Sequence, residues 1–276
     1  MPWHAQLALD YELQAGRSVA RFLHEGPLRI LHSLYPEGDA VCHNVLVHPP
    51  GGLVGGDTLD INITVKAGAH GLVTTPGATR FYRSLGAAAV QNTRIQLDAD
   101  ARFEWLPLEA ICYSGCIAEN KLRLNLAPGA ECLGWDITAL GLPQADLPFA
   151  EGSLLQHIEA PGLWLERGHI RATDARLLHS PLGLAGQHCM ATLFWVAGSK
   201  LARARRQAAL DVAREVICGH ALKTTAGATS PNEQVVVVRV LSPMVEPASA
   251  LLRQVWLAWR QHFWNITGPG PRIWAM

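Results

Sequence analysis

The chain has 276 residues, of which 49% are hydrophobic and 17% charged, so it can bury a sizeable core, and one large domain is expected. Lysine plus arginine and aspartate plus glutamate both total 23, and this balance argues against nucleic acid or an anionic membrane surface as a partner. No apolar stretch reaches the ~18 residues of a membrane helix, so the hydrophobic excess predicts apolar surface that another protein covers.

The first long region, from about Ala40 to Ser199, alternates apolar and polar residues with the period of half-buried strands. Leu59 to Val65 is typical of this pattern. A unit of a strand, a short turn and an alanine recurs at Ala69, Ala101 and Ala130, which are 32 and 29 residues apart. This spacing is compatible with stacked layers of a coiled β-architecture, and equally with a coincidence in a Greek-key sandwich.

The C-terminal region changes to helical periodicity. Lys200 to His220 and Glu246 to Phe263 each carry an apolar stripe, and the run Val235 to Val240 between them reads as a buried strand. The tail from Thr267 to Met276 is too rich in proline and glycine for a helix, and its apolar last residues predict that it docks on a surface. The stripes consist of Leu201, Ala204, Ala208, Val212 and Val216, and of Leu251, Leu252, Val255, Trp256, Trp259 and Phe263.

A glycine-rich segment runs from His48 to Asp57. Its two prolines stiffen the chain, and its two glycine pairs permit positive φ and close backbone approach. The segment has neither the GxxxxGK[ST] nor the GxGxxG spacing, so phosphate binding is not predicted. It fixes Asp57 at the start of a strand, where the carboxylate could cap backbone N–H groups or offer an oxygen ligand to a passing cation.

A polar segment follows from Leu72 to Ser84. It is a strand that runs into a turn and then presents Arg80, Tyr82 and Arg83. A solvated edge would explain these residues. Hydroxyl, guanidinium and aromatic groups at this density also suit a polar internal channel or a protein interface.

Three motifs in order carry a resemblance to a known family. PPGG-x-x-GGD ends at Asp57, TTP-x-ATR-x-YRS spans Thr74 to Ser84, and EWLP-x-E spans Glu104 to Glu109. In this order and spacing, the chain resembles the urease accessory protein UreD family, called UreH in some organisms. The likeness covers nearly the whole chain, since it continues through Gln91, Gly134-Trp135-Asp136, Leu165-Glu166-Arg167, Val237 to Leu241 and Pro271 to Trp274.

The resemblance implies a mainly β fold, like a right-handed β-helix with two α-helices near its C-terminal end. It implies a cytoplasmic urease maturation factor that is not an enzyme: a scaffold for apo-urease, a UreF-type accessory protein and a UreG-type GTPase. No cofactor is expected to stay bound, and nickel would be in transit through an internal polar tunnel to the urease active site. The candidates for this route or its scaffolding are Asp57, Thr74, Thr75, Arg80, Tyr82, Arg83, Glu104, Glu109 and Glu166.

We expect a single UreD-type domain over residues 1–276, β-rich to about residue 199 and helix-containing from about residue 200. The late tryptophans and the tail are expected to form part of the surface that faces the UreF-type partner, because aromatic residues concentrate at protein interfaces. The interface candidates are Trp256, Trp259, Phe263, Trp264, Arg272, Ile273 and Trp274.

Cysteine and histidine give no sign of a high-affinity metal site. The six cysteines are spread over a chain with no secretory segment at its start, which predicts a reduced, cytoplasmic setting. Cys112 and Cys116, atypical of the family, could bind a soft metal only with two further ligands; structural or incidental thiols are the alternative. The twelve histidines form no HxH or HxxxH pair, which suits a conduit that an ion must leave readily. The family usually has glutamine at Leu108, so the expected polar lining is interrupted there.

An enzyme is the main alternative. β-helix proteins often cleave polysaccharides, and the paired carboxylates of Glu104 and Glu109 could serve as acid and base. Pro107 between them leaves their relative direction unreadable. No GxSxG, HExxH or Ser/His/Asp signature supports another hydrolase. A carbohydrate-binding solenoid would favour exposed aromatic rows, whereas the tryptophans here cluster late in the chain.

Overall fold

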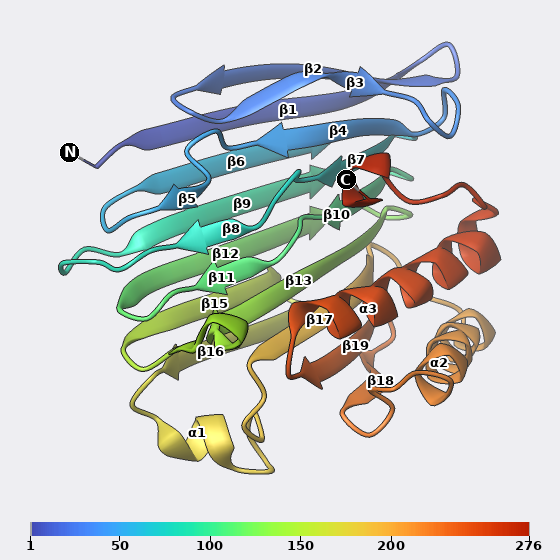
Figure 1. Cartoon of the computed structure of the whole chain (residues 1–276). Helices are drawn as coiled ribbons and strands as arrows, with labels where there is room; N and C mark the ends of the chain where they lie inside the picture. Colours follow the sequence, from blue (N-terminus) through green and yellow to red (C-terminus); the bar gives the residue numbers. More distant parts are fainter. Residues whose placement is uncertain (1, 276) are drawn as a thin grey trace.

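Two large β-sheets, joined by a chain that passes repeatedly from one to the other, make up most of the structure (Figure 1). The computed structural model describes residues 2–275. Sheet A has seven strands and sheet B has twelve, and an apolar core fills the space between them. This arrangement is a β-solenoid of about four turns and confirms the predicted β-helix-like fold.

The strands are best described by sheet. Sheet A consists, in spatial order, of β16 (Trp164–Arg171), β15 (Gly152–Ala160), β12 (Cys116–Leu126), β9 (Ala89–Leu97), β6 (Thr58–Val65), β1 (His4–Gln14) and β2 (Arg17–Glu25). The main path of sheet B is β18 (Ala226–Asn232), β19 (Val235–Ser242), β17 (Cys189–Ala197), β13 (Glu131–Leu142), β10 (Arg102–Leu106), β7 (His70–Thr74), β4 (Cys42–Val47) and β3 (Arg29–Leu34). Its short side strands are β5 (Gly52–Leu53), β8 (Thr79–Phe81), β11 (Ala110–Cys112) and β14 (Leu147–Pro148).

Parallel pairing between successive coils builds the solenoid. Strands β6, β9, β12 and β15 pair in parallel in sheet A, and β4, β7, β10 and β13 do so in sheet B. The corners between the sheets carry Ala69, Ala101 and Ala130, all buried. The backbone N–H of Arg102 donates to the carbonyl of Ala69, and that of Glu131 to the carbonyl of Ala101, both at 2.9 Å. The repeated alanine unit therefore marks stacked layers and not a coincidence in a Greek-key sandwich.

Sheet B is covered on both faces, which explains its composition. Inward-facing residues of β13, such as Cys132, join the core between the sheets. Outward-facing Leu133 and Trp135 join a second core beneath the helices. A strand with two buried faces needs apolar residues at nearly every position, and the predicted buried run Val235 to Val240 forms most of β19 for this reason.

The two helices predicted near the C-terminal end are present as α2 (Arg203–Cys218) and α3 (Val245–Trp259), and they cover the outer face of sheet B (Figure 1). Helix α3 buries the predicted stripe from Leu251 to Trp259. The apolar stripe predicted for α2 is displaced by one residue. Its predicted member Ala204 is exposed, and the residues one position later in the predicted series face the sheet. The buried residues of α2 are Ala209, Leu210, Ala213 and Ile217.

The remaining helical segments are short. They are α1 (Ala175–His179), which the sequence did not predict, the 3₁₀ turns η1 (Pro143–Ala145) and η3 (Arg272–Ala275), and the π-helical turn η2 (Arg260–Trp264), which continues α3. Within residues 2–275, no helix combines the length and the apolar character needed to cross a membrane.

The C-terminal tail docks on the chain itself, so the surface predicted for it is intramolecular. The indole N–H of Trp274 donates to Thr74 Oγ1 at 2.8 Å, and its ring centroid lies 5.4 Å from that of Trp256. The prediction that the tail has no helix was wrong for η3. Pro271 directly precedes this turn, and its carbonyl accepts the first hydrogen bond of the turn from the Trp274 N–H at 3.1 Å.

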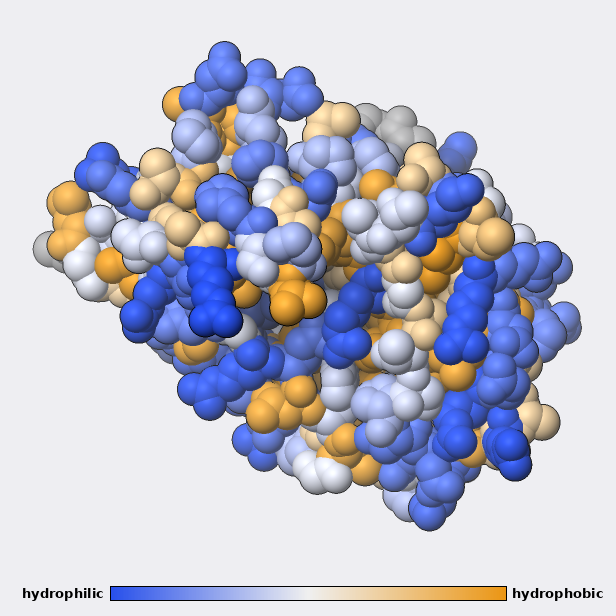
Figure 2. All heavy atoms as spheres, turned by 90° about the horizontal axis from the view of Figure 1, so that it is seen from below, coloured by the Kyte–Doolittle hydropathy of each residue, from blue (hydrophilic) through white to orange (hydrophobic). Residues whose placement is uncertain are grey.

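Apolar residues also reach the surface. Seen from below, they form separate patches (orange) between hydrophilic residues (blue) (Figure 2). The most exposed large apolar side chains include Leu85 and Leu182, both in connecting segments, and Leu23 of the edge strand β2. Single exposed residues of this kind are normal for a soluble fold and do not by themselves define an interface.

Candidate functional site

Polar side chains interrupt the apolar core between the two sheets. In sheet A, Gln91, Asn120 and Gln156 lie on neighbouring strands at the same register, so their amide groups form a row across β9, β12 and β15. Gln91 Nε2 donates to Asn120 Oδ1 at 3.3 Å. Asp136 of β13 faces this row from sheet B. We name the set the interior polar column; it comprises Gln91, Thr93, Asn120, Asp136, Thr138 and Gln156.

Asp136 is the charged centre of this column. Its carboxylate accepts from Asn120 Nδ2 at 2.8 Å, Gln156 Nε2 at 2.5 Å and Thr138 Oγ1 at 3.1 Å. Burial raises the pKa of Asp136 to about 6, against the lowering effect of these donors. Among residues 2–275, no lysine, arginine or histidine forms an ion pair with it. The charge of the ionised carboxylate is therefore held by neutral dipoles and remains able to attract a cation.

Two cavities lie beside the column. The larger has a volume of about 260 Å³ and the smaller about 20 Å³, and Thr79, Gln91, Trp105 and Pro107 line both. Thr93 lines the smaller one, and its Oγ1 is buried without a hydrogen-bond partner in the described chain. About 10–15 Å³ suffices for one water, so the smaller cavity has room to hydrate this hydroxyl.

The larger cavity brings together two of the predicted route residues, Thr75 and Arg80. His48 also lines it, and its Nε2 atom is buried without a hydrogen-bond partner among residues 2–275. Burial lowers the pKa of His48, which favours the neutral imidazole despite the nearby charge of Asp57. A neutral imidazole nitrogen is a suitable ligand for a borderline divalent cation, and hydroxyl oxygens are weaker ligands beside it.

Asp57 lies at the strand entrance that the glycine pairs predict. Gly56 has a φ of +95°, and a Cβ on Gly52 would lie 2.3 Å from the Tyr82 ring, so both positions need glycine. The Asp57 carboxylate is buried and accepts from the backbone N–H of Val54 at 2.9 Å and of Trp3 at 3.2 Å. Of the two interpretations considered for Asp57, these contacts favour the backbone cap.

The other predicted route residues lie apart from the cavities described above. Tyr82 is partly exposed and packs on Tyr113 with ring centroids 5.0 Å apart. Arg83 pairs with an exposed carboxylate at the surface, and Thr74 meets the C-terminal tail. Glu166 of β16 accepts from Thr192 Oγ1 at 2.7 Å, and its negative charge is one cause of the raised pKa of Asp136.

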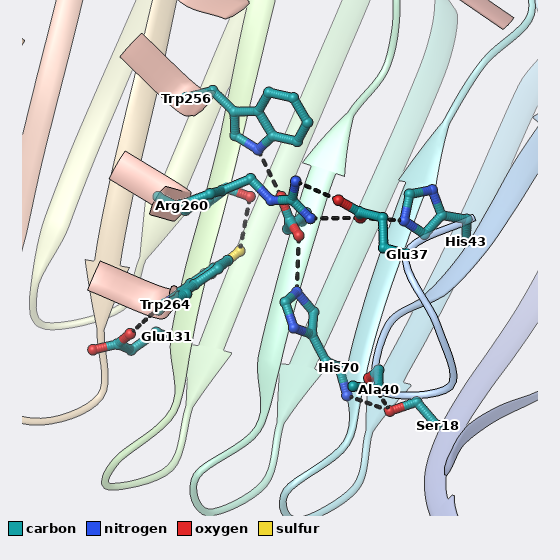
Figure 3. Close-up of polar contacts among 12 residues, drawn as sticks. Ser18, Glu37, Ala40, His43, His70, Glu131, Trp256, Arg260 and Trp264 are labelled. Carbon is teal, nitrogen blue, oxygen red and sulfur yellow. Dashed lines mark hydrogen bonds and ion pairs between the residues drawn. The ribbon is translucent and has the colours of Figure 1, made fainter. Parts of the chain in front are cut away.

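Glu104 occupies the opposite face of sheet B, beneath α3. Its side chain is fully buried, accepts from Trp256 Nε1 at 2.6 Å and lies 2.8 Å from His70 Nε2. Arg260 Nε lies 3.0 Å from Glu104 Oε2, the oxygen that also accepts from Trp256. The guanidinium nitrogens of Arg260 donate to both oxygens of Glu37 at 2.9 and 2.7 Å. Figure 3 shows Arg260 reaching from the end of α3 to Glu37. We name the group the ion cluster; it comprises Glu37, His43, His70, Glu104, Trp256 and Arg260.

The ion cluster is electrostatically satisfied. Burial opposes the charge on Glu37, but hydrogen bonds from His43 and Arg260 outweigh it and hold its pKa at about 2. The pKa of Glu104 is lowered as well, because Arg260 and His70 outweigh its burial. Burial lowers the pKa of His70, which favours its neutral form. Both carboxylates already have cationic or donor partners, so this cluster fixes α3 to sheet B and is not a free cation site.

The predicted interface tryptophans are mostly buried within this chain. Trp259 Nε1 donates to the carbonyl of Ala209 at 2.9 Å, and Trp264 Nε1 to Glu131 at 2.5 Å. Their stripe faces sheet B and α2, and Trp256 belongs to the ion cluster. Among the seven candidates, the residues with accessible surface are Phe263, Arg272, Ile273 and Trp274. The interface with the UreF-type partner stays a prediction.

The cysteines are placed as buried thiols, except for exposed Cys218. Cys112 and Cys116 contact each other, and this hydrogen bond and burial raise the pKa of Cys112. Within the described part of the chain, no group of three or more histidine, cysteine, aspartate or glutamate side chains could hold a metal ion. The described residues therefore give the cysteine pair no further ligands.

Glu104 and Glu109 do not face a common site. Glu104 points into the ion cluster, whereas Glu109 lines a surface groove at the start of β11. Paired acid–base catalysis needs both carboxylates on one substrate. The geometry therefore does not support the carbohydrate-active alternative.

The sequence matches one known protein family over nearly its whole length. A model of the family described as "UreD urease accessory protein" matches residues 4–275. Proteins named urease accessory protein UreD are 70% identical in Polaromonas sp. strain JS666, over the full length of both chains, and 51% identical in Leptothrix cholodnii, over 99% of each. One from Methylibium petroleiphilum is 47% identical, again over 99% of each chain. The chain therefore belongs to the UreD family of urease accessory proteins.

Proposed function

We propose that this protein acts in urease maturation as a scaffold for apo-urease and the UreF- and UreG-type accessory proteins, and that it helps to deliver nickel through its interior. Family membership and the names of its relatives support the role in maturation. The observation that supports a nickel route is the carboxylate of Asp136, which accepts hydrogen bonds from neutral donors and lines the smaller cavity. That cavity shares four lining residues with the larger one.

The proposed route begins in the larger cavity, where His48, Thr75 and Arg80 line the wall. It continues past Gln91 into the smaller cavity at Asp136. The ionised carboxylate attracts a divalent cation, while the surrounding amides, hydroxyls and water bind it weakly. Weak binding suits nickel as cargo, because the ion must leave as readily as it enters.

The route is tested by filling the smaller cavity without changing its charge. Thr93→Ile replaces the unpaired hydroxyl beside Asp136 with an ethyl group, whereas Thr93→Val replaces it with a methyl group of similar size and so keeps the shape of threonine. We expect Thr93→Ile to lower the nickel content of urease matured with it, and Thr93→Val to lower it less. Partner binding, measured by co-purification, should be unchanged in both variants. Equal nickel loading by Thr93→Ile and the unmodified protein would contradict the route.

A further inference from the structure

A groove of about 310 Å³ lies outside the interior polar column, where the starts of β11 and β17 and the ends of β13 and β19 meet the start of α3. Its walls are largely apolar and include Ile111, Leu142 and Val245. Gln144 Nε2 donates to Met244 Sδ, so the turn η1 is held across one side of the groove. The groove is therefore a shaped depression built from four separate segments.

The groove combines apolar walls with uncompensated negative charge. Glu109 and Glu246 both line it, and within residues 2–275 neither forms an ion pair or a side-chain hydrogen bond. Burial raises the pKa of the Cys189 thiol, which lies in the groove wall, to about 12, and the negative charges of Glu109 and Glu246 add to this effect. Arg253 interacts with Glu109 at longer range and stacks on Trp274 at 4.6 Å. Arg253 therefore offsets part of the Glu109 charge, whereas within residues 2–275 Glu246 has no ion-pair partner.

These features specify the chemistry of an occupant. An apolar depression of this size accepts one or two bulky apolar side chains, and such anchors in pockets contribute most of the affinity at protein interfaces. The carboxylates at Glu109 and Glu246 favour a cation beside the anchor and disfavour an acidic segment. The first turn of α3 favours an anion, but Glu246 already occupies that position.

We propose that this groove docks a segment of a partner protein that inserts a bulky apolar side chain and places a lysine or arginine against Glu109 and Glu246. The inference rests on the proposed scaffold role and names one surface through which that role is exercised. Binding at this groove needs neither the interior polar column nor nickel, because the groove opens at the molecular surface between η1 and α3.

The test uses the full chain and two blocked hexapeptides. Both contain leucine and phenylalanine; one flanks them with lysine and arginine, the other with two glutamates. The methyl signal of Met244 in the NMR spectrum, assigned by Met244→Leu, reports occupancy of the groove. We expect a saturable shift with the basic peptide and at least about fivefold weaker binding of the acidic one.

Variants locate the site. The double variant Glu109→Gln with Glu246→Gln should weaken the basic peptide at least about fivefold, because it removes the attraction and leaves the apolar wall intact. A matched double variant on the outer face of sheet A, Glu119→Gln with Glu159→Gln, should bind it as the unmodified chain does. These rim substitutions are mild, and thermal unfolding of each variant checks that it is folded.

The proposal would be overturned if the Met244 signal showed no saturable shift, or if the two peptides bound with equal affinity. It would also be overturned if the protein self-associated in a concentration-dependent way that perturbed the Met244 signal, because the groove would then bind a second copy of this chain. The titration contains no urease and no nickel. Failure of the groove is therefore distinguishable from failure of nickel delivery.

Discussion

Two acidic residues on opposite faces of sheet B differ in how their charge is balanced. Glu104, on the outer face of β10, meets the guanidinium of Arg260, His70 and Trp256. Asp136, on the inner face of β13, meets only amide and hydroxyl donors and lines a small cavity. Glu104 is fully buried and Asp136 is half-buried beside the cavity that it lines, and only Glu104 has a full positive charge beside it.

The difference separates a structural carboxylate from one that can serve a cation. A carboxylate paired with arginine offers little attraction to a third charge, and breaking the pair leaves a buried ion uncompensated. A carboxylate whose hydrogen-bond partners are all neutral still attracts a cation. The adjacent cavity leaves room for an ion and its bound water to approach that carboxylate. Glu104 was among the predicted route residues, and Asp136 is the residue that the geometry adds.

Removing the arginine should cause the largest effect. Arg260→Met leaves Glu104 and Glu37 buried without their cation, so it should lower the free energy of unfolding by about 3–5 kcal/mol, measured by urea denaturation. Arg83→Met, which breaks the exposed pair with Glu151, is the control and should cost no more than about 1 kcal/mol. Similar losses in the two variants would show that the ion cluster is not the anchor of α3.

Asp136 should make stability depend on pH in the opposite sense to a paired carboxylate. Its folded pKa of about 6 lies above the unfolded value of about 3.9, so its contribution is fully present below about pH 4 and is lost as the pH rises through about 6. Asp136→Asn removes this dependence.

The free energy of unfolding of Asp136→Asn, relative to the unmodified protein, should therefore rise by about 1–3 kcal/mol between pH 4 and pH 7, with the lower end reached if cavity water solvates the charge. Urea titrations at several pH values measure this difference. A difference that stays constant over this range would show that Asp136 is not a buried, neutrally solvated acid.

A smaller effect is expected at Asp57. Because its carboxylate caps the backbone N–H groups of Trp3 and Val54, Asp57→Ala should lower stability by about 0.5–2 kcal/mol, seen in thermal unfolding. Urease activation per folded molecule should then be unchanged. A fully stable Asp57→Ala that fails to activate urease would instead assign Asp57 to the route.

The fold was largely predictable because its signals are local. A strand is indicated by the alternation of apolar and polar residues within a short segment, as in Leu59 to Val65. The turn after such a strand is indicated by the corner alanines Ala69, Ala101 and Ala130. The sequence alone left stacked coils and a Greek-key sandwich open, because the choice depends on which strands pair. The tryptophan stripe of α3 was correctly placed on one face, but an apolar stripe does not say whether it meets its own sheet or a partner.

The interior polar column was missed, although a signal for it exists. Asn120 lies between inward-facing Ala118 and Leu122, and Gln156 lies between inward-facing Leu154 and Ile158. A polar residue at a core position of an alternating strand is such a signal, because it needs a buried partner. The partners belong to other coils, and the register that aligns them is set by turn lengths that the pattern does not determine.

The most direct test of the central claim is the nickel content of urease matured with Asp136→Asn, in which the charge is removed and the shape of the side chain is kept. Glu119→Gln, on the outer face of β12, is the matched control. With partner binding unchanged in both variants, we expect less nickel per urease active site with Asp136→Asn and a normal amount with Glu119→Gln. Normal nickel loading with Asp136→Asn would contradict it.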